Sequence, residues 1–248
     1  MEHMKSFLDK NLVDIVTLMM WIGLCIFVLL IFYAIFIKLR DRKLLYSVTK
    51  PNRGTSSERD LVLKLLKLEV PAQAIFHDLY VKKSDGKYSQ IDLVVAAKTG
   101  IIVFEVKDYS GWIFGNAKNR EWTQVLAYGE VKHRFYNPVM QNNSHIIALR
   151  KQLKQFNNIP FYSVIVFYGD CVLKEVSFVP DGTYLVYSGS INEVMDLLLY
   201  KNTLASYSDK FEVVRVLREA VQNGENRKIQ NQHIENIQDM LGKQRIYD

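Results

Sequence analysis

A run of 22 residues without a charged side chain, Val16–Ile37, constrains this chain more than any other feature of its sequence. As an α-helix the run would be about 33 Å long, close to the roughly 30 Å hydrocarbon core of a bilayer. A buried helix of a soluble protein is the alternative, but such helices rarely stay uncharged over this length. A cleaved signal peptide would need a basic leading segment and a small-residue cleavage site, and this region has neither. The run therefore predicts a transmembrane helix over residues 16–37.

The charges on either side of this run predict its orientation. Only Lys5 and Lys10 are basic before it. Cytoplasmic flanks of membrane helices are enriched in Lys and Arg, so residues 1–15 are expected outside and the rest of the chain in the cytoplasm. We therefore expect a single-pass protein of the cell membrane with a basic juxtamembrane linker at 38–56, whose residues 38–53 also favour anionic lipid head groups. The basic residues after the run are Lys38, Arg40, Arg42, Lys43, Lys50 and Arg53.

The remaining 248 − 37 = 211 residues are enough for one domain with its own core and a small appendage. The whole chain is 49% hydrophobic and 23% charged, which excludes a disordered chain or a small disulfide-stapled one. Of the two cysteines, Cys25 lies in the apolar run and Cys171 in a predicted strand. We therefore expect no disulfide bond, as suits a reducing compartment.

Helices and strands alternate along these 211 residues. A helix is expected at 58–69, with Ser57 as its N-cap, and Asn137-Pro138 is typical of the start of a helix that runs to about residue 156. Strands are expected at 74–82, 89–97, 100–108, 161–167, 175–179 and 183–187, with a tight turn at 98–100 that joins two of them into a hairpin. Further helices are expected at 191–201, 204–222 and 226–242, within a helical C-terminal region at 191–248. The pattern predicts an α/β fold with a mixed central sheet flanked by helices.

Two charged residues interrupt the most apolar of these strands near its end. Both faces of Gly100–Phe104 are apolar, which is typical of a central strand covered on both sides. Glu105 and Lys107 then follow on one face, because alternate residues of a strand point the same way. Desolvating an ion pair costs several kcal/mol per ion, so such a pair on a core strand suggests a function. The alternative is an ordinary surface ion pair at a solvent-exposed strand end.

Asp92 lies in the preceding apolar strand. If the two strands pair through the 98–100 turn, Asp92 can approach Glu105 and Lys107. Two neighbouring carboxylates repel each other unless a cation lies between them. Hard oxygen ligands suit Mg²⁺ or Mn²⁺ rather than zinc, and a nearby lysine can orient a water or stabilise negative charge on a phosphate.

An Asp, a hairpin and then Glu-x-Lys at the end of a core strand resembles the PD-(D/E)xK nuclease superfamily. A longer match resembles its nuclease-related domain (NERD) family over about residues 55–160. The motifs that carry it are Glu58 at a helix start, Gln90-Ile91-Asp92, Glu105-Val106-Lys107-Asp108-Tyr109-Ser110-Gly111, and Asn137-Pro138-Val139-Met140-Gln141-Asn142. The family's Gly-Glu lead-in is Ser57-Glu58 here. The resemblance implies a restriction-endonuclease-like fold over residues 57–190 and metal-dependent hydrolysis of phosphodiester bonds.

The resemblance also implies roles for individual residues. Asp92 and Glu105 would hold the metal ion, Lys107 would assist the attacking water, and Glu58 and Gln141 would complete the catalytic site. Each of the last two has another explanation, since Glu58 favours a helix N-terminus in any case and Gln141 can simply be solvated. His145 shares the helix face of Gln141 but is left outside the expected catalytic set.

Nucleic acid is the expected partner, with DNA favoured and RNA left open, and basic residues around the site would supply the positive field that phosphates need. Trp112 and Trp122 can stack on bases, although buried core tryptophans are commoner. The sequence contains no GxxxxGK(S/T) phosphate-binding loop and no Cys and His spacing typical of a zinc site. It also lacks the Gly-x-Ser-x-Gly motif that carries the nucleophile of many esterases. The alternative to a nuclease is a membrane-tethered nucleic-acid-binding or adaptor module without turnover. The basic residues in question are Lys118, Arg120, Lys132, Arg134, Arg150, Lys151 and Lys154.

Overall fold

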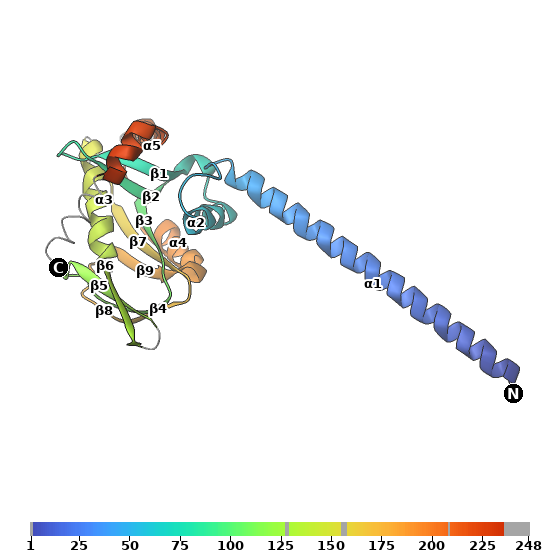
Figure 1. The fold of residues 1–248 in the computed structure, drawn as a ribbon. Helices are drawn as coiled ribbons and strands as arrows, with labels where there is room; N and C mark the ends of the chain where they lie inside the picture. The colour runs from blue at the N-terminus through green and yellow to red at the C-terminus, as the bar shows by residue number, and fades with distance from the viewer. Residues whose placement is uncertain (1, 127–128, 155–157, 208, 236–248) are drawn as a thin grey trace. The chain divides into compact units, whose positions relative to one another are not determined.

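The computed structural model describes residues 2–126, 129–154, 158–207 and 209–235. The chain forms two compact units, Met1–Tyr46 and Ser47–Asp248. The first unit contains helix α1 (Glu2–Leu45), which continues beyond the apolar run through Lys38, Arg40, Arg42 and Lys43 (Figure 1). Its segment Thr17–Leu45 is long and apolar enough to cross a membrane, as a membrane anchor or a signal sequence would be.

The described residues of the second unit form nine strands, the helices α2 to α5, and a further helical stretch at residues 227–235. The helices are α2 (Ser56–Lys67), α3 (Pro138–Gln152), α4 (Ile191–Tyr200) and α5 (Lys210–Asn223). The strands are β1 (Ile75–Lys82), β2 (Tyr88–Ala97), β3 (Gly100–Asp108), β4 (Gly111–Asn116), β5 (Glu121–Leu126), β6 (Val131–Tyr136), β7 (Phe161–Tyr168), β8 (Cys171–Ser177) and β9 (Thr183–Tyr187).

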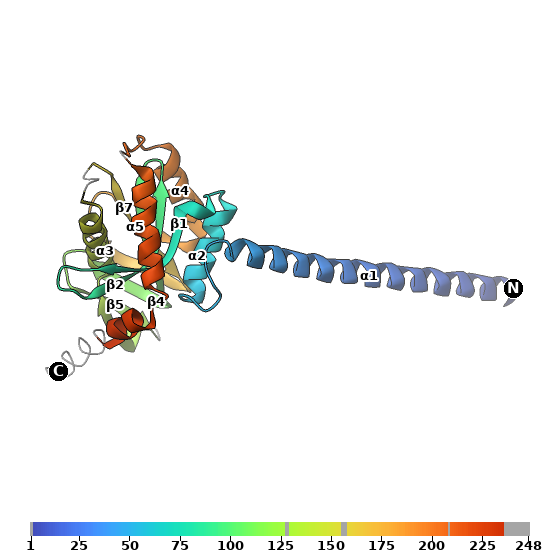
Figure 2. The same cartoon turned by 90° about the horizontal axis from the view of Figure 1, so that it is seen from above.

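The central sheet has the strand order β1-β2-β3-β7-β9. Strands β1, β2 and β3 are antiparallel, whereas β3, β7 and β9 are parallel, so the sheet is mixed and β3 lies at its centre. Figures 1 and 2 show α3 on one side of this sheet and α2 and α4 on the other. The expectation of an α/β domain with a mixed central sheet flanked by helices is confirmed.

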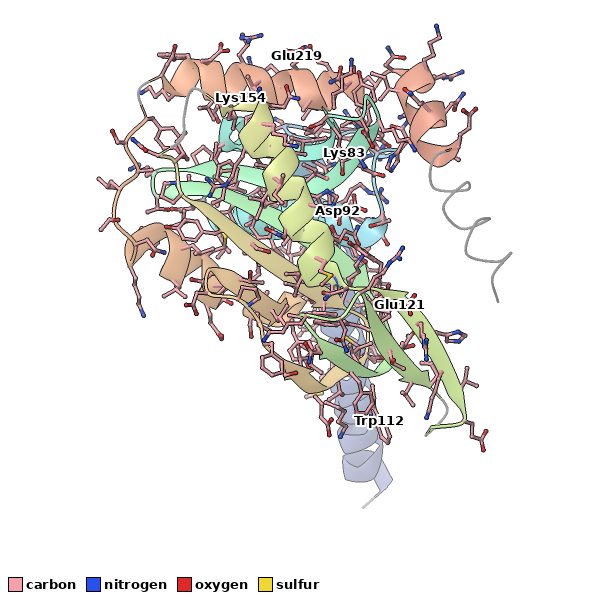
Figure 3. All side chains as sticks on the ribbon, turned by 90° about the vertical axis from the view of Figure 1, so that its left-hand side faces the viewer. Lys83, Asp92, Trp112, Glu121, Lys154 and Glu219 are labelled. Carbon is pink, nitrogen blue, oxygen red and sulfur yellow. The ribbon has the colours of Figure 1, made fainter. Side chains whose placement is uncertain are left out.

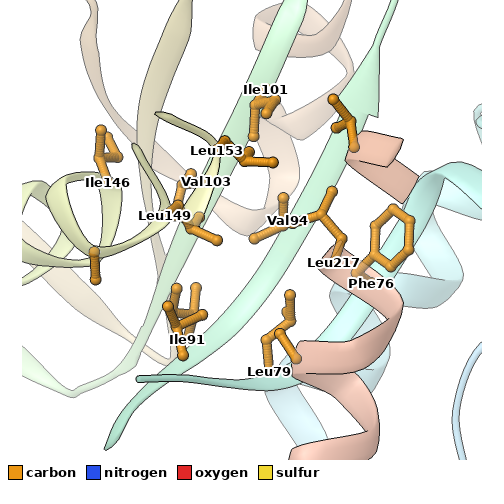
Figure 4. Close-up of a cluster of buried hydrophobic side chains, with 14 of the residues drawn as sticks. Phe76, Leu79, Ile91, Val94, Ile101, Val103, Ile146, Leu149, Leu153 and Leu217 are labelled. Atoms are coloured by element: carbon orange, nitrogen blue, oxygen red, sulfur yellow. The ribbon is translucent and has the colours of Figure 1, made fainter. Parts of the chain in front are cut away.

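The main hydrophobic core lies where α3 and α5 pack against the central strands (Figure 4). Leu149 of α3 and Leu217 of α5 are fully buried there against Val94 of β2 and Val103 of β3. Burying a side chain of this size contributes roughly 1.5–3 kcal/mol relative to leaving it in water. This core therefore fixes α3 on the sheet and leaves the polar residues of its first two turns beside the end of β3.

A second sheet, with the order β6-β5-β4-β8, lies beyond the end of β3. Strands β4, β5 and β6 were not predicted, because their residues alternate irregularly between apolar and polar and β6 is exposed over most of its length. The inner face of this sheet packs on a smaller core around Ile113, Trp122 and Phe167. The two sheets meet at the three residues that connect β3 to β4.

Several predicted element boundaries differ from the structure; the strand expected at 175–179, for example, is β8 at Cys171–Ser177, because it pairs with β4 from its first residue. Thr55, not Ser57, caps α2, because Thr55 and Glu58 form a reciprocal capping box while the Ser57 hydroxyl donates to Asp108. Helix α5 begins at Lys210 rather than 204, because the chain before it is held to the β2–β3 turn and Asp209 caps the helix. The last part of the helix expected at 226–242 lies outside the described residues.

Candidate functional site

The β2–β3 hairpin brings Asp92 and Glu105 together. Val94 pairs with Val103, so the alternation of the two strands places Asp92, Glu105 and Lys107 on the same face of the sheet. The ladder ends at the pair Leu93–Phe104, where Asp92 would next face Glu105. There the Val106 amide donates to Asp92 Oδ2 at 2.7 Å, so a side chain takes the place of a backbone acceptor. The two strands thus part at the point where their acidic side chains meet.

Strand β1 is irregular at the same level. His77 pairs with Leu93 and Leu79 with Ile91, so Asp78 is left out of the ladder opposite Asp92. Asp78 has φ of 55°, a left-handed conformation that is uncommon for residues other than glycine. Its carboxylate accepts hydrogen bonds from Arg53 Nε at 3.0 Å and Gln90 Nε2 at 2.9 Å, which hold Asp78 in this conformation.

Lys107 connects the sheet to α3. Its ammonium lies 2.7 Å from Glu105 Oε1 and donates to Gln141 Oε1 at 3.0 Å. Glu105 is buried and only 16% of the Lys107 side chain is exposed, so the charge of the ammonium is only weakly screened by water. The sequence-predicted residues Asp92, Glu105, Lys107 and Gln141 therefore lie in one cluster at the end of β3. Figure 3 shows Asp92 in this region, beside α3.

Two buried asparagines fix the start of α3. Asn137 is fully buried and caps the helix, accepting from the amides of Val139 and Met140. Its Nδ2 also donates to backbone carbonyls of the β4–β5 turn, including those of Ala117 at 3.0 Å and Asn119 at 2.7 Å. One turn later, Asn142 donates to the carbonyl of Val103 at 2.8 Å. The helix turn that carries Gln141 is thus tied to both sheets.

His145 also belongs to this cluster, which sequence reasoning missed. Its Nε2 lies 3.2 Å from Glu105 Oε2, and since a carboxylate only accepts, the imidazole donates there. Its Nδ1 lies 3.0 Å from Ser89 Oγ on β2. The signal was the four-residue spacing from Gln141, which puts both side chains on one face of α3.

Glu58 takes a different position from the other expected site residues. Its Oε1 accepts from the backbone and hydroxyl of Thr55, and its Oε2 lies 3.3 Å from Nε2 of the buried His77. His77 pairs with Leu93 and so points to the face of the sheet opposite Asp92. Glu58 still influences the site, because its negative charge is one of the causes that raise the pKa of Asp92.

The electrostatic environment shifts the pKa values of Asp92 and Glu105 in opposite directions. Burial, followed by the negative charges of Glu105 and Glu58, raises the pKa of Asp92 well above its ordinary value. Burial also acts to raise the pKa of Glu105, but the His145 hydrogen bond and the Lys107 ammonium outweigh it and hold that pKa below its ordinary value. The pKa of Lys107 is raised in turn, because Glu105 outweighs the effect of burial. Lys107 is therefore charged at neutral pH.

The donor set at this point suits a hard divalent cation. A cation between Asp92 and Glu105 would favour ionised carboxylates and remove the repulsion that raises the pKa of Asp92. Within the described part of the chain, no three His, Cys, Asp or Glu side chains surround a common point. Mg²⁺ is typically held by one or two carboxylates together with waters and substrate phosphates, so two carboxylates suffice for it. The residues present therefore fit Mg²⁺ or Mn²⁺ better than zinc or calcium.

The basic residues expected to contact nucleic acid fall into two groups. Lys118 and Arg120 lie in the β4–β5 turn, and Lys132 and Arg134 lie on β6, all of them exposed. The others are at the far end of α3. Arg150 lies over the ring of Phe161, Lys151 donates to Ser84, and Lys154 follows the helix (Figure 3).

The region that forms this cluster is similar to known proteins. Residues 53–168 match the nuclease-related domain family. An uncharacterized protein of Bacillus anthracis is 31% identical over 144 residues, which span 58% of this chain and 66%, just under two thirds, of that protein. No solved structure matches the chain. The family match covers β2, β3 and α3, the elements that carry Asp92, Glu105, Lys107 and Gln141.

Proposed function

We propose that this chain, whose residues 53–168 are a nuclease-related domain, is a membrane-anchored nuclease that hydrolyses phosphodiester bonds of DNA with Mg²⁺ or Mn²⁺. The observation that carries the proposal is the cluster at the end of β3. Two carboxylates from neighbouring strands, an ammonium and an amide converge there. A merely structural ion pair would not need the second carboxylate beside it.

Each residue of the cluster has a distinct task in this proposal. Asp92 and Glu105 would hold the metal ion, which supplies Lewis acidity toward the phosphate and favours ionisation of water. The Lys107 ammonium is placed to stabilise negative charge that develops on the phosphate or to orient the attacking water. Gln141 accepts from Lys107 and so limits where its ammonium can go. His145 holds Glu105 from the other side.

The test is a cleavage assay with the full chain in detergent micelles. Labelled single-stranded DNA, duplex DNA and RNA are incubated with EDTA and then with increasing Mg²⁺, Mn²⁺ or Ca²⁺. We expect products from DNA with Mg²⁺ or Mn²⁺ and none with EDTA, because two carboxylates alone do not activate water. Binding without products under every metal and pH would instead support a tethered binding module. Equal cleavage in EDTA would contradict metal dependence.

We also propose that α1 anchors the chain in the cell membrane, with its N-terminus outside and the nuclease domain in the cytoplasm. The apolar segment Thr17–Leu45 and the cluster of basic residues at its C-terminal end support this orientation.

Alkaline carbonate extraction and protease digestion of intact cells test the anchor. We expect the chain to stay in the membrane pellet, at full length on a denaturing gel, and its domain to resist protease added outside. Release of the chain into the carbonate supernatant, or a shortened mature chain, would contradict a retained anchor, and digestion of the domain would reverse the orientation.

A further inference from the structure

The outer face of the second sheet is unlike an ordinary protein surface. Trp112 pairs with Val125 and Val172, and its side chain is 36% exposed, whereas Trp122 on the inner face is buried. Tyr136 on β6 is 45% exposed. Figure 3 shows Trp112 and Glu121 in this sheet, well apart from Glu219 on α5. A four-stranded sheet thus presents aromatic rings to solvent on one face while its other face packs on the core.

Cations lie beside Trp112 and beside a further aromatic residue, Phe178. Lys174 Nζ is 5.1 Å from the ring centre of Trp112, and Lys118 Nζ is 4.3 Å from that of Phe178, at the end of β8. Arg134 lies two residues before Tyr136 on β6, therefore on the same face, and 79% of its side chain is exposed. Two acids share this face, Glu121 and Glu175, and Glu121 Oε2 lies 3.7 Å from Arg134 Nη1, so the acids offset part of the positive charge and the two lysines supply the rest.

The strand pairings show that this face is continuous. Phe114 of β4 pairs with Thr123 of β5, which pairs with Arg134 of β6, so these residues follow one line across the sheet. An open depression of about 600 Å³ lies along this line, and its lining includes Phe114, Thr123 and Glu175. A flexible chain of flat groups can therefore lie across the strands without a change in the backbone.

The face also lies within reach of the candidate active site. Trp112 is five positions after Lys107 along the chain, so their Cα atoms are at most about 18 Å apart. Gln124 Nε2 donates to the carbonyl of Ser110 at 2.8 Å, which fixes this connection to β5.

We propose that this face binds single-stranded nucleic acid, with Trp112 and Tyr136 stacking on bases and Lys174, Lys118 and Arg134 contacting phosphates. Exposed aromatic rings with interleaved cations are the features by which proteins bind single strands without reading their sequence. Paired bases in a duplex do not offer their faces to such rings. The inference rests on the proposed nuclease function and specifies its substrate class.

Fluorescence anisotropy of a labelled 20-nucleotide oligothymidylate, with the full chain in micelles and EDTA present, tests this platform. We expect Trp112→Ala to raise the Kd on the order of tenfold, in the range for loss of one stacked base, and Trp112→Phe to raise it less than about threefold. Tyr136→Ala is expected to act in the same direction. The matched control is Tyr200→Ala, an exposed aromatic residue on α4, which should change the Kd less than about twofold.

Binding of a 20-base-pair duplex is the second readout, and it should be unchanged by Trp112→Ala. Equal oligothymidylate binding by the wild type and Trp112→Ala, equal losses for single strand and duplex, or no single-strand binding by the wild type would each overturn the inference. If the substitutions weaken binding but the wild type never cleaves DNA with any metal, the platform stands and the proposed nuclease function fails.

Discussion

Replacing Lys107 by alanine is expected to lower the rate of metal-dependent DNA cleavage about 100- to 1,000-fold, the loss typical for removal of one preorganised group that stabilises transition-state charge. Lys107 is the only described cation that contacts both Glu105 and Gln141. The measurement is the initial rate on labelled single-stranded DNA at saturating Mg²⁺.

Lys98→Ala is the matched control for this substitution. Lys98 lies in the turn between β2 and β3 and is exposed, so its loss removes the same charge from the same hairpin. We expect the cleavage rate of Lys98→Ala to stay within about twofold of the wild type, as is usual for exposed residues away from a site. A Lys107→Ala rate that also stays near the wild-type rate would remove Lys107 from the mechanism.

The hairpin at the centre of the site could be predicted because its signals are local. Lys98-Thr99-Gly100 separates two apolar strands, and Gly100 has φ of 145° with the carbonyl of Pro160 where a Cβ would lie. Alternation along β3 then puts Glu105 and Lys107 on one face. The apolar surroundings of both charges mark them as unusual without any knowledge of the fold.

The second sheet could not be predicted in the same way. Strands β4 and β5 are six residues long with few buried side chains, such as Ile113 and Trp122, and β6 is mostly exposed, so their sequences show no strict alternation. Their pairing depends on contacts with the first sheet, such as those of Tyr109 with Phe135 at 4.6 Å between ring centres. Such contacts form only after the two segments meet in the folded chain.

The part played by His145 also depends on tertiary structure. Forty residues separate His145 from Glu105, and their contact is set by how far along the sheet α3 lies. That position follows from Asn137 and Asn142, whose side chains bind backbone groups of the two sheets. Helical periodicity places His145 on the face of Gln141 but gives no information on what that face meets.

The position of Glu58 shows a limit of the family resemblance. The motif places a Glu at the start of a helix, and Glu58 is there, but its carboxylate completes a capping box and faces His77. Its role in catalysis remains a proposal that its negative charge near Asp92 supports.

The central claim is that two neighbouring strands bring the carboxylates of Asp92 and Glu105 to one divalent cation. Its most direct test uses the six-line electron paramagnetic resonance signal of free Mn²⁺, measured during titration of the full chain in micelles. The double variant Asp92→Asn with Glu105→Gln keeps the shape of both side chains and removes their charges. Glu193→Gln with Asp196→Asn removes two exposed acids from α4 and is its charge-matched control.

We expect the wild type and the α4 control to bind Mn²⁺ equally, and the double variant to bind it at least about 100-fold more weakly. Even the loss of groups that only support a ligand typically weakens metal binding about 10- to 100-fold, and this variant loses both proposed ligands. Mn²⁺ binding by the double variant that equals that of the wild type would contradict the claim that Asp92 and Glu105 form the metal site.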